Sequence, residues 1–397
     1  MIAVFLLPVY ILVNLYIFRW LVRWLKALSV HFQKRGFQAV VILIYLFFST
    51  SLLTGFLFPA GKSGRFLKLA GNYWLGVLLY SMMMVILADL IRLILKHGKI
   101  IDREKLGSRK LFAVSGTLCI GVILTLSLWG VLNARTLCTT KYEVTVSKET
   151  ENLDSLNIVL IADLHLGYNT GCSQMKEMVE KINIQNPDII VIAGDIFDNE
   201  YEALDDQETL ISILREMRSK YGVYAVYGNH DIQEKILAGF TFSSGDQKKV
   251  SSTEMDQFLK NADITLLRDE AVLIADSFYL YGRPDYRRPG RGIDRRKTPE
   301  ELTRDLDPGK PVIVLDHEPN ELQELADAGV DIDLCGHTHD GQMFPGNLTI
   351  NWFWENPYGY LQKDRMHNIV TSGVGVFGPA MRIGTKAEIC VIKVNFS

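Results

Sequence analysis

The chain lacks most features that would mark a disulfide-bonded or repetitive protein. Its five cysteines form no CxxC pair and no even framework, so a disulfide is neither required nor excluded. It has no internal repeat and no low-complexity tract, which argues against a solenoid. Acidic residues are scarce in residues 1–134, which hold 3 Asp+Glu against 15 Lys+Arg, whereas residues 135–397 hold 42 against 27. The two parts of the chain therefore suit different surroundings.

Charged residues are almost absent from four long apolar stretches in the first part. Each stretch is near or above the length of about 20 residues that crosses a bilayer, and none has the polar stripe of a helix in a soluble bundle. A signal peptide is the alternative for the first stretch, but it lacks a basic n-region and a small-residue cleavage site, so we predict a retained helix. The predicted spans of this transmembrane region (residues 1–134) are 2–18, 37–59, 73–95 and 111–132.

Basic residues in the connecting loops predict the orientation of these spans. The first and third loops carry five and seven Lys or Arg residues, and the second carries three. Loops rich in Lys and Arg remain in the cytoplasm, so we predict that the N-terminus and residues 135–397 lie outside it. Asp89 is a lone carboxylate within the third span. Arg92 follows it at i, i+3, so we predict a local ion pair there rather than an intramembrane functional site.

The second part alternates between apolar runs and helical patterns, which indicates an α/β fold with a largely parallel sheet. Residues 135–155 are read as a polar linker in which 142–146 alternate like an edge strand, and residues 156–397 as one domain. Residues 240–253 read as a loop or lid. The predicted helices are 173–185, 205–220 and 319–328, and the predicted strands are 156–162, 187–193, 223–227, 264–267, 271–274, 278–281, 312–315, 332–335, 348–350, 369–372 and 388–394.

Polar clusters follow five of the buried strands. Buried strands that end in Asp, His or Asn place these side chains in the crevice beyond the carboxyl ends of a sheet. Five of the eight histidines fall in the clusters, a concentration that scatter rarely produces. The clusters are Asp163-Leu164-His165, Gly194-Asp195-Ile196-Phe197-Asp198, Gly228-Asn229-His230-Asp231, Asp316-His317-Glu318 and Gly336-His337-Thr338-His339.

In this order the five motifs resemble those of the calcineurin-like metallophosphoesterases, over roughly residues 155–397. The Gly341-Gln342-Met343-Phe344-Pro345 tail after the last motif is similar to that of the membrane-tethered, YkuE-like branch of the family. The resemblance implies an αββα sandwich of two packed sheets flanked by helices. It also implies a metal-dependent phosphoesterase with two divalent ions. Mixed imidazole and oxygen ligands suit Mn, Fe or Zn, and spacing does not choose among them.

The resemblance also assigns roles to individual residues. Asp195 is expected to bridge the two metals. His230 is expected to give a proton to the leaving oxygen, with Asp198 as the carboxylate that orients it; a turn cap is the alternative for Asp198. Asp231, Asp316 and Glu318 are expected to support the site rather than to bind metal. The remaining expected ligands are Asp163, His165 and His339 for one ion, and Asn229, His317 and His337 for the other.

Two features bear on the substrate. Residues 283–297 are rich in arginine and form either a solvated loop or an anion-binding flap; Arg283 and Arg287 are the candidates, together with Arg382. Trp352-Phe353-Trp354 is expected to meet the bilayer interface or an apolar substrate. We therefore predict a membrane-bound phosphoesterase that acts on a phosphorylated or pyrophosphate-bearing lipid or envelope precursor, with no nucleic acid partner. The alternatives are a phosphodiesterase or nucleotide phosphatase on soluble substrates, and a non-catalytic membrane sensor.

Overall fold

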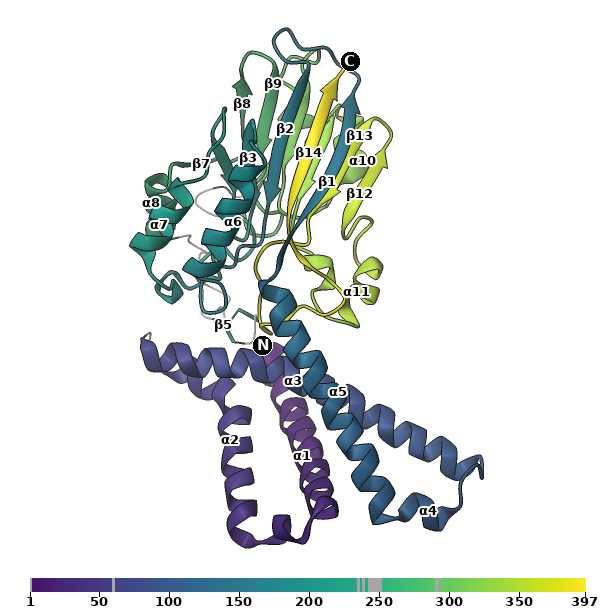
Figure 1. Cartoon of the computed structure of the whole chain (residues 1–397). Helices are drawn as coiled ribbons and strands as arrows, with labels where there is room; N and C mark the ends of the chain where they lie inside the picture. The colour runs from purple at the N-terminus through teal and green to yellow at the C-terminus, as the bar shows by residue number, and fades with distance from the viewer. Residues whose placement is uncertain are drawn as a thin grey trace. The chain divides into compact units, whose positions relative to one another are not determined.

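The computed structural model describes residues 2–58, 61–233, 236–237, 240–241, 252–289, 293 and 295–397. Two compact units are present (Figure 1). The helical unit contains mainly Met1–Leu132. The α/β unit contains Asn133–Lys235, Ser243–Phe377 and Arg382–Ser397. Most of the predicted lid at 240–253 lies outside the described residues.

The helical unit forms because its sequence is apolar over whole helix lengths. Three of its described helices, α2, α3 and α5, are long and apolar enough to cross a membrane by length and composition. The fourth predicted span, 2–18, lies within α1, and its insertion stays a prediction. The helices are α1 (Ile2–Leu28), α2 (Arg35–Leu57), α3 (Lys62–His97), α4 (Arg103–Gly107) and α5 (Arg109–Arg135), with the short 3-10 turn η1 (Val30–Gln33).

Two polar side chains of α3, Asp89 and Arg92, have partners other than the expected ones. Asp89 accepts a hydrogen bond from Tyr16 at 2.6 Å, and Arg92 donates to the carbonyl of Leu106 at 3.3 Å. The predicted ion pair between Asp89 and Arg92 is therefore wrong, because each side chain finds its partner on another helix. Spacing within one helix does not reveal such partners.

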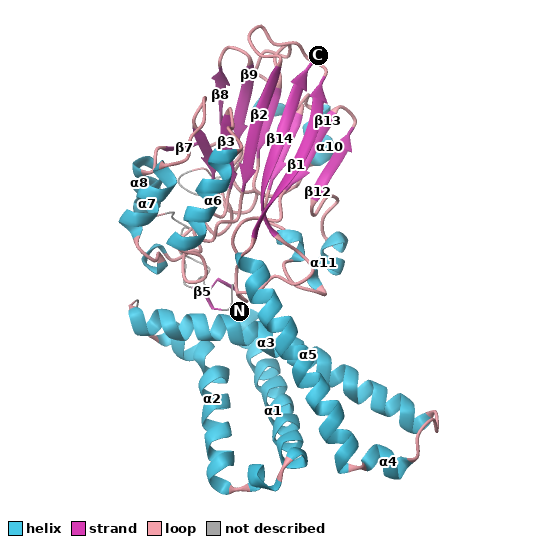
Figure 2. Ribbon diagram, viewed as in Figure 1, coloured by secondary structure: helices cyan, strands magenta, loops and turns pink. Residues whose placement is uncertain are grey.

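The α/β unit is built on two six-stranded sheets (Figure 2). The first has the order β1-β14-β2-β3-β4-β7 and the second the order β12-β13-β11-β10-β9-β8. The strands of the first sheet are β1 (Leu137–Val146), β2 (Ser155–Ile161), β3 (Ile189–Ala193), β4 (Val223–Val226), β7 (Ile264–Leu266) and β14 (Ala387–Phe396). Those of the second are β8 (Glu270–Ile274), β9 (Phe278–Gly282), β10 (Val312–Leu315), β11 (Ile332–Cys335), β12 (Gly359–Lys363) and β13 (Met366–Val370).

Strand direction confirms the predicted α/β class and the largely parallel pairing. In the first sheet β2, β3, β4 and β7 pair in parallel, and in the second β13, β11, β10 and β9 do so. The edge strand expected at 142–146 is β1, which pairs in parallel with β14. The helices are α6 (Cys172–Ile184), α7 (Gln207–Arg215), α8 (Thr253–Asn261), α9 (Pro299–Thr303), α10 (Leu322–Asp327) and α11 (Gly346–Thr349); the short strands β5 (Ile236–Leu237) and β6 (Phe240–Thr241) pair with each other.

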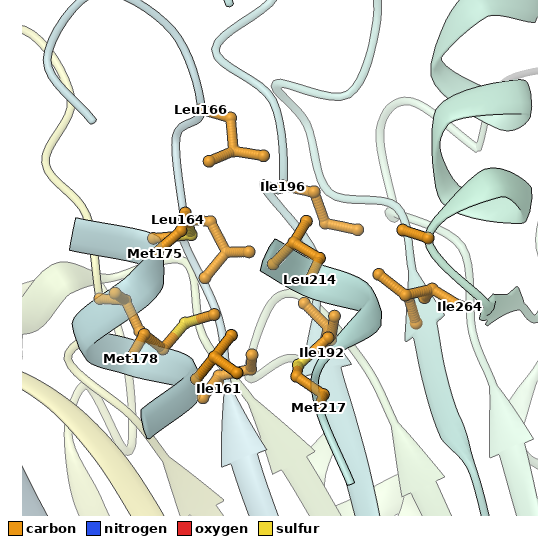
Figure 3. Close-up of a cluster of buried hydrophobic side chains, with 14 of the residues drawn as sticks. Ile161, Leu164, Leu166, Met175, Met178, Ile192, Ile196, Leu214, Met217 and Ile264 are labelled. Atoms are coloured by element: carbon orange, nitrogen blue, oxygen red, sulfur yellow. The ribbon is translucent and has the colours of Figure 1, made fainter. Parts of the chain in front are cut away.

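Three hydrophobic clusters hold this unit together. One lies between the first sheet and α6, α7 and α8, where Met178 lies beside Ile161 and Met175 beside Leu164 (Figure 3). Met175 and Met178 are fully buried, so both are core residues. A second cluster contains side chains of both sheets, including Leu160 and Leu315. The third joins the second sheet to α9 and α10. Both sheets are thus buried on two faces, which is why their central strands read as continuous apolar runs.

Candidate metal centre

The functional side chains follow the carboxyl ends of parallel strands from both sheets. Asp163, Asp195 and Asn229 follow β2, β3 and β4 of the first sheet, and His317 and His337 follow β10 and β11 of the second. The loops that carry them are strained. Asp163, His165, Asp195, His337 and His339 have positive φ angles between 44° and 73°, a conformation that side chains other than glycine adopt at a cost, often at functional sites.

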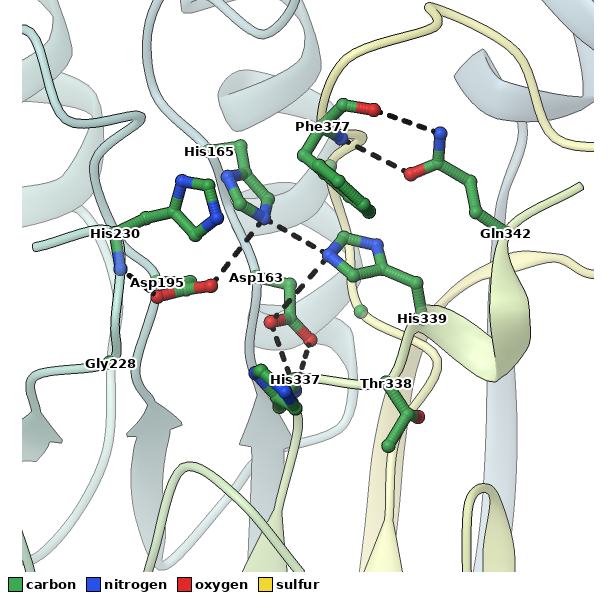
Figure 4. A network of polar contacts seen from close by, with 12 residues as sticks. Asp163, His165, Asp195, Gly228, His230, His337, Thr338, His339, Gln342 and Phe377 are labelled. Atoms are coloured by element: carbon green, nitrogen blue, oxygen red, sulfur yellow. Dashed lines mark hydrogen bonds and ion pairs between the residues drawn. The ribbon is translucent and has the colours of Figure 1, made fainter. Parts of the chain in front are cut away.

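The first group of donor atoms comes from Asp163, His165 and His339, which are all buried and lie within 4.8 Å of one another. His165 Nε2 lies 3.0 Å from His339 Nε2, and His339 Nε2 lies 3.7 Å from Asp163 Oδ1 (Figure 4). Burial and the neighbouring charge of His165 hold the pKa of His339 well below its ordinary value. His339 is therefore neutral, the form of imidazole that binds a metal.

The second group comes from Asp195, His317 and His337, also within 4.8 Å of one another. Asn229 joins it, because its Oδ1 lies 3.0 Å from His317 Nε2 and 2.9 Å from His337 Nδ1. Burial and the charge of His317 lower the pKa of His337 to about 3, so this imidazole is neutral as well. Two nitrogens and an amide oxygen that converge at such distances form a donor set suited to a divalent metal.

Asp195 reaches both groups. Its Oδ2 lies 3.2 Å from His317 Nε2 and 3.8 Å from His165 Nε2. Its Oδ1 accepts a hydrogen bond from the backbone N–H of His230 at 2.7 Å. The approach requires Gly228, because a Cβ there would lie 2.3 Å from Asp195 Oδ1. All seven predicted ligands thus converge in one place, and the residues present fit a divalent metal centre.

His230 and Asp198 lie beside the first group. Asp198 Oδ1 is 3.5 Å from His230 Nδ1 and 3.4 Å from His165 Nδ1. Burial would lower the pKa of His230, but the charges of Asp195 and Asp198 outweigh it and raise the pKa. Burial would raise the pKa of Asp198, but its close contacts with the imidazoles of His165 and His230 lower it to about 2. A carboxylate beside an imidazole that binds protons readily is suited to proton donation.

The three predicted substrate-binding arginines lie away from this arrangement or behind it. Arg283 is fully buried, and its terminal nitrogens donate to Asp316 and Glu321, each at 2.8 Å. Arg287 is exposed. Arg382 is fully buried behind His339, with Nη2 3.2 Å from His339 Nδ1 and 2.6 Å from the carbonyl of Ser372. None of the three lines the cavity above the ligands. Arg291, in the same arginine-rich stretch, lies outside the described residues.

Some residues that support the candidate ligands were not singled out in the sequence, and others were singled out without a predicted partner. Glu318 Oε1 lies 3.6 Å from His337 Nε2, the ring nitrogen that faces away from the donor group. Arg288 donates to the backbone carbonyl of Asn229 at 3.1 Å. The side chain of Gln342 bonds to both backbone groups of Phe377. Groups that orient metal ligands matter nearly as much as the ligands, but their pairing depends on the fold.

Comparisons with known proteins agree with this geometry. A family model described as calcineurin-like phosphoesterase matches residues 156–341. The chain is 30% identical to a transmembrane protein with metallophosphoesterase domain from Danio rerio, over 80% of this chain and 73% of that protein. Its Bos taurus counterpart is 31% identical, over 71% of this chain and 62% of that protein. The uncharacterized metallophosphoesterase YkuE of Bacillus subtilis is 26% identical, over 65% of this chain and 85% of that protein.

Proposed function

The chain belongs to the calcineurin-like phosphoesterase family, and from that premise we propose that it is a membrane-bound, two-metal hydrolase of phosphate esters carried by lipids or envelope precursors. The observation that carries the proposal is the convergence of six donor side chains around Asp195, whose Oδ2 lies 3.2 Å from His317 Nε2 and 3.8 Å from His165 Nε2. Two donor groups that share one carboxylate are the arrangement that a dinuclear centre needs.

In the proposed centre, Asp163, His165 and His339 hold one ion, Asn229, His317 and His337 hold the other, and Asp195 bridges them. Divalent ions at these positions supply Lewis acidity and neutralise the charge on the phosphoryl oxygens. The metals are Mn, Fe or Zn, which all accept mixed imidazole and oxygen ligands. His230 donates a proton to the leaving oxygen, and Asp198 keeps the imidazole oriented for that transfer.

We further propose that residues 156–397 form the αββα sandwich of the family, that residues 135–155 lead into it and add the edge strand β1 to its first sheet, and that residues 1–134 are a four-span membrane region. Three clusters of buried side chains around two sheets support the first part. Three described helices that are long and apolar enough to cross a membrane support the last. The lipid substrate is supported by the exposed aromatic side chains of Trp352 and Phe353, which are 79% and 75% accessible, since large exposed apolar groups mark interaction sites.

The bridging carboxylate offers the sharpest test. Asp195→Asn should lower the metal content per chain and abolish hydrolysis of 4-nitrophenyl phosphate, because a neutral amide cannot hold two cations together. Asp276→Asn is the matched control, since Asp276 is an exposed residue of the same unit and asparagine tolerates its positive φ of 54°. Metal analysis of the purified protein and circular dichroism would accompany the assay. Full activity with two metals bound to Asp195→Asn would refute the proposal.

A further inference from the structure

The cavity above the donor groups has a volume of about 420 Å³. Its floor is the metal centre, with four imidazoles and Asp195. Among the described residues that line it there is no lysine and no arginine. The walls beyond the floor are apolar or uncharged and include Ile350, Phe353, Trp354 and Phe377. A second phosphate placed there would lose its hydration without gaining a cationic partner, which is costly.

Phe377 forms one side of this cavity at close range to the site. Its ring centroid lies 5.3 Å from that of His339 and 6.0 Å from those of both His165 and His230. The ring therefore lies beside the imidazoles of His165 and His339, at the edge of the first donor group (Figure 4). Trp354 forms another wall, since its ring meets His337 edge-on with centroids 5.1 Å apart and planes at 73°.

Gln342 holds Phe377 in this position. Its Nε2 donates to the carbonyl of Phe377 at 3.0 Å, and its Oε1 accepts from the N–H of Phe377 at 3.1 Å. Gln342 is itself buried, and its own carbonyl accepts a hydrogen bond from Thr385 at 2.7 Å. One amide thus occupies both backbone groups of a single residue, which fixes the backbone from which the ring projects.

We propose that this cavity selects phosphate esters whose organic group is apolar and carries no second anion near the reacting phosphate. Phe377 is the specificity-determining residue, and Gln342 is a positioning residue that acts through it. The inference rests on the proposed function, and it narrows the substrate class from phosphorylated or pyrophosphate-bearing molecules to esters of an apolar alcohol.

A binding series on the metal-loaded, full-length protein tests this without turnover. The ligands are methyl-, ethyl-, butyl- and hexylphosphonate, measured by isothermal titration calorimetry in one detergent. In the wild type, affinity should rise roughly two- to fourfold for each added methylene over the first carbons, because each is removed from water. Replacing butylphosphonate by 4-phosphonobutyrate, which ends the chain in a carboxylate, should cancel this gain.

The following variants distinguish loss of the apolar cavity wall from a general loss of folded structure. Phe377→Ala should flatten the dependence on chain length while leaving methylphosphonate affinity and metal content unchanged. Phe377→Leu should keep about half of the slope, because it retains apolar volume. Gln342→Ala should also reduce the slope. Tyr360→Ala and Gln362→Ala, at exposed positions on β12 outside the cavity, should bind as the wild type does.

A flat series in the wild type, or an unchanged slope in Phe377→Ala, would overturn the inference. Equal affinity for butylphosphonate and 4-phosphonobutyrate would do the same. Hydrolysis of 4-nitrophenyl phosphate by the wild type is measured in parallel. If the protein hydrolyses that ester but shows a flat binding series, only this inference fails. If binding depends on chain length but no ester is hydrolysed with metals bound, the proposed function fails instead.

Discussion

At the scale of single residues, Asp198 connects two parts of the site. Its carboxylate lies within 3.5 Å of the outer nitrogens of both His165 and His230. With its pKa lowered to about 2 by these imidazoles against the effect of burial, it is ionised throughout the neutral range. The sequence suggested a partner for His230 alone. The geometry adds His165, so the proposed metal binding and the proposed proton donation would depend on the same negative charge.

The proton donor can be tested through the leaving group. His230→Asn should keep both metals, because the backbone N–H that bonds to Asp195 remains. Turnover of an alkyl ester should fall about 10²- to 10⁴-fold, as expected for loss of a general acid. The loss should be much smaller for 4-nitrophenyl phosphate, whose leaving group departs without a proton. Steady-state rates on both esters check this, and an equal loss on both would contradict the role.

The seven candidate ligands could be singled out in the sequence because each follows a buried strand in a short motif. The sequence did not indicate the groups that support them. Gln342 and Phe377 are 35 residues apart, and Arg288 lies 59 residues from Asn229. Such pairs meet only after the strands have paired. Arg283 was expected to bind anions for a similar reason, because a run of arginines does not reveal which of its members is buried.

At the scale of elements, a buried ion network joins the segments that follow β9 and β10. Arg283 and Arg296 both bond to Asp316, which is fully buried, and both reach Glu321. Asp316 immediately precedes the ligand His317 and also accepts its backbone N–H at 2.8 Å. The network therefore fixes the backbone of a proposed metal ligand, and this gives Arg283 and Arg296 a structural role.

This role predicts a stability effect rather than a binding effect. Arg283→Met should lower the free energy of unfolding by about 3 kcal/mol, the lower end for removing one partner of a buried ion pair, because Asp316 keeps Arg296. Arg287→Met, at an exposed position, should leave both the Tm and KM unchanged. Thermal unfolding and steady-state kinetics measure these quantities. If Arg287→Met raised KM and Arg283→Met left the Tm unchanged, residues 283–297 would instead be interpreted as an anion-binding flap.

Strands marked by an apolar run were predictable even when short, as β10 and β11 show, whereas several elements without such a run were not. The strand expected at 348–350 is wrong, because these residues form the end of α11 and the start of a 3-10 turn (Ile350–Trp352). Three residues are too few to distinguish alternation from a helical turn. The helix α9 was missed although its signal was present: Thr298 and Glu301 form a capping box around Pro299.

At the scale of the whole molecule, the two parts of the chain have net charges of opposite sign. Residues 1–134 have a net charge of +12 and residues 135–397 a net charge of −15. The basic loops predict that the α/β unit lies outside the cytoplasm. Protease added to intact cells should then digest this unit while a cytoplasmic control protein survives. Protection of the unit until the membrane is broken would reverse the predicted orientation.

The pairing of β1 with β14 has a consequence for the order of events during synthesis. β14 lies between β1 and β2 and bonds to both, with β1 in register from Leu137↔Ala387 to Val146↔Phe396. It also follows every other strand of the unit along the chain. The ribosome releases N-terminal segments first. Some 240 residues are therefore synthesised between β1 and its neighbour β14, and contacts between segments so distant in sequence form slowly. All seven candidate ligands, the last of which is His339, are thus made before β14 can join β1 to the rest of the first sheet.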